Sequence, residues 1–176
     1  MHPWTVLIVA HVVGALTSVA LGGYHVWRRP RGDRRHRVLG RVWVALMLWT
    51  AISSFWIRDI NEGAFSWLHV LSVVTLVTVT LGVVQVRRGN IAAHRGNMVG
   101  SWLGAVGAMV AAVAVPGRMI PTYALDRPGG ALAFLVAVLL GTVVLVAAGS
   151  WLADVVDRRA ERARGGARQV AAGLRH

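Results

Sequence analysis

Long apolar runs separated by short polar segments dominate this chain. Five runs lie at about residues 4–26, 38–57, 65–86, 97–115 and 130–153. Each is close to the roughly 20 residues that an α-helix needs to cross a hydrocarbon core about 30 Å thick. The pattern therefore predicts an all-α, polytopic membrane bundle of five transmembrane helices. Of the 176 residues, 56% are hydrophobic and 15% are charged, which is typical of this class and argues against a water-soluble domain.

The first four runs form two similar halves. In each half, a His near the start of an apolar run is followed 25 residues later by a His-Arg pair, and the halves lie 58 residues apart. The histidines are His11 and His36 in the first copy, and His69 and His94 in the second. We therefore expect a duplicated helical hairpin, with repeats over about 4–57 and 65–115.

This repeat suggests a division of the chain into three parts. Residues 1–120 are expected to form the four-helix membrane core, and residues 121–156 a fifth transmembrane helix with its preceding loop. That helix falls outside the repeat, so we expect it to be peripheral. Residues 157–176 form a basic tail, either an interfacial helix or a disordered extension. The first run lacks a basic segment before it, which favours a retained helix over a cleaved leader.

The basic residues are distributed unevenly, and all nineteen are Arg. Sixteen lie in the segments 28–41 and 87–95 and in the tail, whereas only Arg58, Arg118 and Arg127 lie on the opposite side. The positive-inside bias therefore places the N-terminus outside and the C-terminus in the cytoplasm, in the cytoplasmic membrane. The net charge of +12 is explained by topology and by contact with anionic phospholipid, so no nucleic-acid partner is expected.

Three local patterns refine the helices. Asp33 and Asn90 are good N-caps and predict that the second and fourth helices begin there. Tryptophans near both predicted boundaries suggest two aromatic belts. They are Trp4, Trp56 and Trp67 outside, and Trp27, Trp43, Trp102 and Trp151 inside. Glycines at 14, 22, 96, 100, 104 and 107 indicate either close helix contacts or room for a flat macrocycle.

The four repeated histidines are the main candidates for chemistry. His11 and His69 share the predicted outer half of the membrane, while His36 and His94 share the inner boundary. Equivalent residues of a parallel duplication face each other across its axis, so two imidazole pairs are expected. Each pair could ligate one haem iron axially, giving a transmembrane electron relay. Arg37 and Arg95 would then neutralise the haem propionates.

Other interpretations of these histidines remain open. The outer pair could hold copper or zinc for delivery, and the inner pair could meet water or lipid phosphate in an accessory subunit of a membrane complex. A redox partner or a quinone is implied only by the electron-transfer hypothesis, and the oligomeric state is not indicated. The chain has no Cys, and it has no paired carboxylates, nucleophile elbow or phosphate loop, so no hydrolase or transferase is predicted.

Several motifs carry a resemblance to a known family. They are Ser53-Ser54-Phe55-Trp56-Ile57, Gly63 through His69, Arg87-Arg88-Gly89-Asn90 with His94-Arg95 and Met98, Pro116-Gly117-Arg118, and His36-Arg37 with Gly40-Arg41. Over about residues 11–120 the chain resembles bacterial predicted membrane proteins of the domain-of-unknown-function family numbered twenty-three-oh-six. That resemblance implies an architecture and no activity.

A weaker similarity is to cytochrome b561-type proteins. In those proteins four membrane histidines on alternate helices hold two b haems, which would correspond here to His11, His36, His69 and His94. The inner histidines of this chain lie at helix starts and its loops are shorter. The similarity therefore supports an outer haem more than an inner one.

Overall fold

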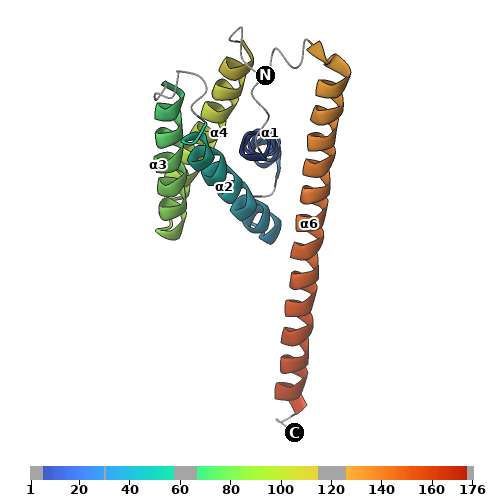
Figure 1. Cartoon of the computed structure of the whole chain (residues 1–176). Coiled ribbons are helices and arrows are strands. Elements are labelled where there is room, and N and C mark those ends of the chain that lie inside the picture. Colours follow the sequence, from blue (N-terminus) through green and yellow to red (C-terminus); the bar gives the residue numbers. More distant parts are fainter. Residues whose placement is uncertain (1–5, 30, 58–66, 115–125, 174–176) are drawn as a thin grey trace.

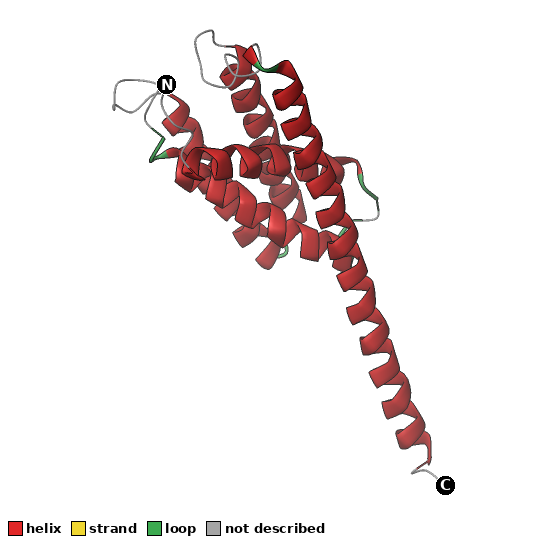
Figure 2. Ribbon diagram, turned by 45° about the vertical axis from the view of Figure 1, so that its right-hand side comes forward, coloured by secondary structure: helices red, strands yellow, loops and turns green. Residues whose placement is uncertain are grey.

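The structure, a computed structural model of the whole chain, describes residues 6–29, 31–57, 67–114 and 126–173. These residues are all helical apart from their turns, as the apolar runs predict (Figures 1 and 2). The helices are α1 (Val6–Trp27), α2 (Arg34–Ser54), α3 (Trp67–Arg87), α4 (Ile91–Ala114) and α6 (Pro128–Gly173).

Among the residues that the structure describes, four helices are long and apolar enough to cross a membrane, which confirms a multi-pass membrane protein. These segments are Val6–Trp27, His69–Arg87, Ile91–Val113 and Pro128–Ala160. α2 is not among them because its first turns carry four Arg. It nevertheless supplies the buried side chains of Leu39, Trp43 and Met47 and contacts α1, α3 and α6. Its neighbours therefore cover much of its surface.

The first four helices form a closed ring. α1 contacts α2, α2 contacts α3, α3 contacts α4, and α4 contacts α1. Over the described residues, the diagonal pairs α1/α3 and α2/α4 make no direct backbone approach. In Figure 1, however, α1 is seen nearly end-on while α3, α4 and α6 run along the page, so α1 crosses them steeply. The five-span topology and the duplicated hairpin therefore stay predictions.

The N-caps predicted for α2 and α4 are confirmed. The Asp33 carboxylate accepts the backbone N–H of His36 at 3.0 Å, and the Asn90 side-chain oxygen accepts that of Ala93 at 3.0 Å. Each cap satisfies an N–H that the helix itself leaves unpaired. Both helices therefore begin before their apolar runs, and each carries its inner histidine in its first turn.

The fifth helix, α6, lies outside the ring but is joined to it by specific contacts. It packs against α1 and α2, and Arg34 and Arg35 of α2 form ion pairs with Asp157 and Asp154. Its backbone continues without a break to Gly173, so no helix end separates it from the tail. The tail is therefore helical at least to that residue, and it projects beyond the other helices (Figure 2).

Two tryptophans occupy the interior of the ring. A Cβ added at Gly22 would lie 2.3 Å from Trp102 Cδ1 and 2.7 Å from Trp43 Nε1, so both indoles pack on this glycine. Their N–H groups donate to the backbone carbonyls of Val19 and Ser18, each at 2.9 Å. Trp43 is only 4% exposed. The assignment of Trp43 and Trp102 to an aromatic belt is therefore wrong, and the space beside Gly22 holds indoles instead of a macrocycle.

The α4 glycines differ from those of α1. A Cβ added at Gly96, Gly100, Gly104 or Gly107 would meet nothing within 4 Å. These four positions lie on the face of α4 that points away from the ring, and they make no close contact with another described helix. The close packing predicted for them is therefore wrong within a single chain.

Candidate functional site

The N-terminal ends of α2 and α4, which the Arg distribution predicts to lie at the inner side of the membrane and which we call the inner end, bring two of the predicted histidines close enough to interact electrostatically. His36 and His94 each lie in the first turn of their helix, as the caps require. Burial lowers the pKa of His36, and the nearby imidazole of His94 lowers it further. The inner pair was predicted from the repeat, and the structure places these residues on diagonally opposite helices of the ring.

His94 is held by a backbone group of the preceding helix. Its Nδ1 lies 2.9 Å from the carbonyl oxygen of Gly82 in α3. A carbonyl only accepts, so Nδ1 carries a proton, and in the neutral ring Nε2 has the lone pair. Metal-bound histidines commonly donate their second ring nitrogen to a backbone carbonyl in this way. His94 thus has the tautomer of a ligand that binds through Nε2.

A third imidazole, His25, belongs to the same end of the molecule. Its ring centroid lies 5.1 Å from that of His36, edge to face, and 5.8 Å from that of Tyr24. The repeat does not identify His25, because the equivalent position in the second copy is Val83. Counting residues from the helix ends would have identified it. His25 lies two residues before the end of α1 and His36 two residues after the start of α2, so both lie at the same end of the helical hairpin.

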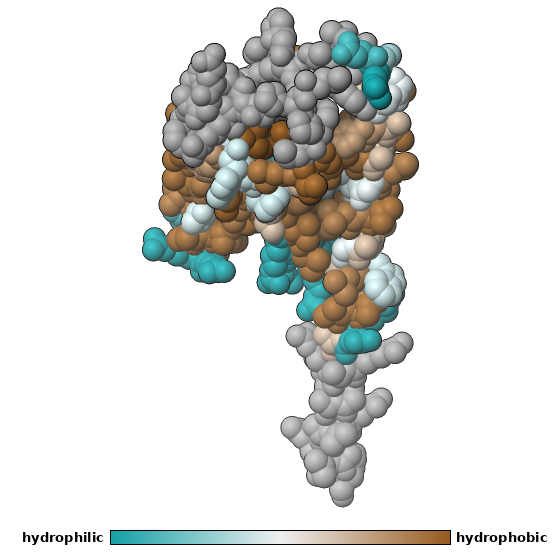
Figure 3. All heavy atoms as spheres, viewed as in Figure 1, coloured by the Kyte–Doolittle hydropathy of each residue, from teal (hydrophilic) through white to brown (hydrophobic). Residues whose placement is uncertain are grey.

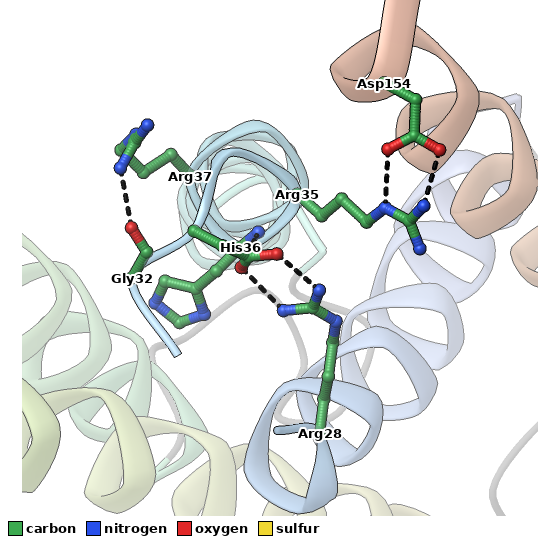
Figure 4. A network of polar contacts seen from close by, with 7 residues as sticks. Arg28, Gly32, Arg35, His36, Arg37 and Asp154 are labelled. Atoms are coloured by element: carbon green, nitrogen blue, oxygen red, sulfur yellow. Dashed lines mark hydrogen bonds and ion pairs between the residues drawn. The ribbon is translucent and has the colours of Figure 1, made fainter. Parts of the chain in front are cut away.

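The turn between α1 and α2 is fixed by charged side chains around these rings. Arg28 donates to both oxygens of Asp33, at 2.7 and 2.6 Å. Arg37 donates to the carbonyl of Gly32, whose φ of 81° favours glycine (Figure 4). Arg37 is therefore engaged within the turn, while Arg95, the other predicted propionate partner, is exposed on α4.

The outer histidines both contact the C-terminal end of α2. His11 Nδ1 lies 2.9 Å from Ser53 Oγ, and the ring of His69, only 6% exposed, lies 5.9 Å from that of Phe55. A further bond of 2.6 Å joins Ser54 to Ser72 of α3. α2 contacts both α1 and α3, so its last turn links the two helices that carry these histidines.

Comparison with known proteins decides the family. The family described as "Predicted membrane protein (DUF2306)" matches residues 8–153, which is most of the chain. The protein belongs to the DUF2306 family. The match extends through the apolar part of α6, so the expectation that the resemblance ends near residue 120 is wrong. No curated protein and no solved structure matches the chain, and the similarity to cytochrome b561-type proteins stays a prediction.

The arrangement of possible metal-ligating side chains limits which metal ions this DUF2306 protein could bind. Among the described residues, no three His, Asp or Glu side chains converge closely enough to hold a metal ion. Zinc usually takes three or four protein ligands. A zinc site with three protein ligands is therefore not present among these residues, and the alternative of copper or zinc held by a histidine pair stays a prediction. A haem iron takes four nitrogens from its own macrocycle and needs only two axial imidazoles.

Proposed function

We propose that this DUF2306 protein binds a b-type haem through His36 and His94 at its inner end and exchanges single electrons there. The proposal is supported by two observations: His36 and His94 lie close enough across the ring to interact electrostatically, and His94 is anchored by the Gly82 carbonyl. When bound, haem would supply a one-electron redox centre. Helical bundles commonly hold cofactors between side chains of facing helices.

The interior of the ring limits the depth of the site. Trp43 lies seven residues beyond His36, and Trp102 eight residues beyond His94. At 1.5 Å per residue, the indoles lie about 10–12 Å deeper along each helix. Because they fill the space beside Gly22, the haem would lie on the inner side of this layer.

The neighbouring arginines differ in their suitability for the haem propionates. Arg37 already donates to the Gly32 carbonyl at 2.6 Å. Arg95 follows His94 directly and is exposed at the inner end. A planar guanidinium matches a carboxylate with two hydrogen bonds. We therefore assign the main propionate contact to Arg95.

We restrict the proposal to the inner pair. The contacts of His11 and His69 run to the end of α2, which lies between their helices in the ring. A second haem between His11 and His69 would require the last turn of α2 to move away. The same movement would be needed for an electron relay across the whole membrane. Cofactor binding by the outer pair is a separate hypothesis with less support.

An absorption spectrum tests the proposal. Protein produced with a haem precursor and purified in detergent should show a Soret band and, after dithionite, a sharp α band. His36→Ala and His94→Ala should each abolish the reduced low-spin spectrum, whereas the matched outer variant His11→Ala should retain it. Arg95→Gln should lower haem occupancy without changing the axial ligands. A colourless wild-type protein, or a full spectrum in His94→Ala, would overturn the proposal.

One observation favours a second function, the binding of anionic phospholipid. At the inner end, the carboxylates of Asp33, Asp154 and Asp157 are each paired with an Arg of α2 or of the turn before it. Nine further Arg are exposed there, and the hydrophilic rim below the apolar band is visible in Figure 3. They are Arg29, Arg31, Arg37, Arg41, Arg87, Arg88, Arg95, Arg158 and Arg159.

This positive surface would attract anionic headgroups with about 1 kcal/mol per Arg close to the membrane surface. Native mass spectrometry with equal amounts of phosphatidylglycerol and phosphatidylcholine tests it. The protein should retain phosphatidylglycerol preferentially, and the Arg87→Gln/Arg88→Gln variant should retain less. Equal retention of both lipids would exclude a selective surface.

A further inference from the structure

α1 and α6 leave an apolar groove between them, within the segments that can cross a membrane. Its volume is about 410 Å³, and of the described residues that line it only Thr17 has a polar side chain. In such segments a groove meets lipid hydrocarbon, which offers no hydrogen bonds. The groove therefore matches a hydrocarbon chain. Its lining includes Val13 and Thr17 of α1, and Phe134, Val138, Gly141 and Leu145 of α6.

The groove is as long as one leaflet of a bilayer. The α6 residues that line it lie on one face of the helix, from Phe134 to Leu145. At 1.5 Å per residue, this face extends about 16 Å along the helix axis. One leaflet of a hydrocarbon core about 30 Å thick is about 15 Å deep. A single acyl chain of a phospholipid therefore matches the groove along its whole length.

The start of α6 offers a place for the phosphate of the same lipid. The Arg127 carbonyl accepts the backbone N–H of Ala131 at 3.0 Å, so Arg127 is the N-cap and Pro128 the first helical residue. A helix leaves the N–H groups of its second and third residues, here Gly129 and Gly130, without an intrahelical partner, and its dipole makes this end positive. A Cβ added at Gly129 would meet nothing within 4 Å, so an anion has room to approach the main chain.

The distance between this helix start and the groove equals the thickness of a headgroup layer. Phe134 lies five residues after Gly129, about 7–8 Å along the axis. A bilayer about 40–45 Å thick with a core of about 30 Å has a polar layer of about 5–8 Å on each side. A phospholipid with its phosphate at the start of α6 would therefore have its acyl chain in the groove.

The two charged residues at this end indicate the headgroup. Asp126 and Arg127 are both exposed and adjacent, so a cationic and an anionic group lie side by side at the start of α6. A zwitterionic headgroup matches this arrangement, with its phosphate at Arg127 and the helix end and its ammonium at Asp126. A primary ammonium can donate hydrogen bonds to the carboxylate, as a Lys side chain does, whereas a quaternary ammonium cannot.

We propose that the groove between α1 and α6 binds a zwitterionic phospholipid with a primary ammonium, one acyl chain in the groove and its headgroup at Asp126 and Arg127. This site is independent of the proposed haem site and of the positive surface at the inner end, because it shares no residue with either. The lipid would fill the space between the fifth helix and the ring.

Photolabelling of the full chain in phosphatidylcholine vesicles tests the groove. The probe is phosphatidylethanolamine with a diazirine in the middle of one acyl chain, and mass spectrometry identifies the labelled peptides. Labels should appear on α1 and α6 at the groove. Gly141→Leu, which extends a side chain into the groove, should lose most of them. Gly104→Leu is the matched control and should keep them, since a Cβ at either glycine meets nothing within 4 Å.

Two further variants test the headgroup. Arg127→Gln should lower groove labelling by about 5-fold, which corresponds to one Arg close to the membrane surface. Asp126→Asn should make the phosphatidylethanolamine probe label no better than a phosphatidylcholine probe. The Arg87→Gln/Arg88→Gln variant should leave groove labelling unchanged, because those residues belong to the inner surface.

Three results would overturn the inference. One is undiminished labelling in folded Gly141→Leu, and another is stronger groove labelling by a phosphatidylglycerol probe than by phosphatidylethanolamine. The third is an efficient disulfide between two molecules of Gly141→Cys in vesicles, because a second copy of the chain would then cover the groove.

Discussion

Arg35 of α2 and Asp154 of α6 form an ion pair with two hydrogen bonds across 119 residues of sequence, and its Nε–Oδ1 distance is 2.9 Å. Figure 4 shows the two side chains meeting between their helices. One turn further into the apolar region, Leu39 Cδ2 lies 2.4 Å from the position of a Cβ at Gly149. The pair and this contact together fix how the fifth helix packs against the ring.

A designed disulfide tests this packing, and the absence of native Cys makes the experiment clean. Leu39→Cys combined with Gly149→Cys should cross-link under mild oxidation, because Leu39 Cγ, near the place that a Cys sulfur would take, lies 3.3 Å from the position of a Cβ at Gly149. Gly40→Cys with Gly149→Cys is the matched control, since Gly40 has no neighbour within 4 Å. Mobility on a non-reducing gel measures the product. Equal cross-linking of both pairs would contradict the observed register of α6.

Substitution of Gly22 should destabilise the fold. A methyl group there overlaps two rigid indoles, at 2.3 Å from Trp102 and 2.7 Å from Trp43. We expect Gly22→Ala to lower the free energy of unfolding by about 1–3 kcal/mol, the usual cost of overpacking. Unfolding in mixed detergent micelles, followed by Trp fluorescence, measures the change.

Gly104→Ala is the matched control for this prediction. A Cβ at Gly104 meets nothing within 4 Å, so the variant should be neutral or up to about 1 kcal/mol more stable, because Ala favours helix over Gly. Similar losses in both variants would show that the indoles do not pack on Gly22.

The Arg28–Asp33 pair gives the turn a defined response to acid. Its hydrogen bonds lower the pKa of Asp33 from 3.8 to about 2. Because the folded-state pKa is depressed, the stabilisation is fully present above about pH 4 and is lost as the pH falls through about 2. Arg28→Gln should raise the pKa of Asp33 toward 3.8.

The 13C shift of the Asp33 carboxyl during a pH titration measures this change directly. Arg88→Gln, in the turn of the other hairpin, should leave the titration of Asp33 unaltered. A wild-type midpoint near 3.8 would contradict the ion pair seen in the turn.

The predicted orientation can be measured with single cysteines. Arg88→Cys lies in the turn between α3 and α4, and Asp126→Cys lies before α6, on the other side of the apolar band. In intact cells, a membrane-impermeant maleimide should label Asp126→Cys and spare Arg88→Cys until the membrane is opened. The opposite pattern would reverse the assignment based on the Arg distribution.

Local signals in the sequence predicted some features of this protein better than others. Asp33 and Asn90 were identified as caps because capping depends only on neighbouring residues. The positions of Trp43 and Trp102 near a predicted membrane boundary did not reveal their role. An indole that packs inside the bundle and one that lies at the membrane interface can occupy the same position along a helix. Another side chain packs closely on Gly22 but not on Gly104. This difference depends on how the helices pack, and no local sequence pattern predicts it.

The candidate site shows the same division. His36 and His94 were identified from the repeat, which compares equivalent positions. His25 was not, because the second hairpin uses the backbone carbonyl of Gly82 for the contact that His25 makes in the first. A carbonyl is present at every residue, so a sequence comparison cannot detect that a side chain and a main-chain atom fill equivalent places.

The continuity of α6 has a mechanical consequence. At 1.5 Å per residue its 46 residues extend about 69 Å, more than twice the thickness of the hydrocarbon core. Asp154 and Asp157 attach it to α2 near the point where it leaves the apolar band. A small change in the tilt of α2 at that attachment would therefore move the far end of this rigid rod through a larger arc in the aqueous phase.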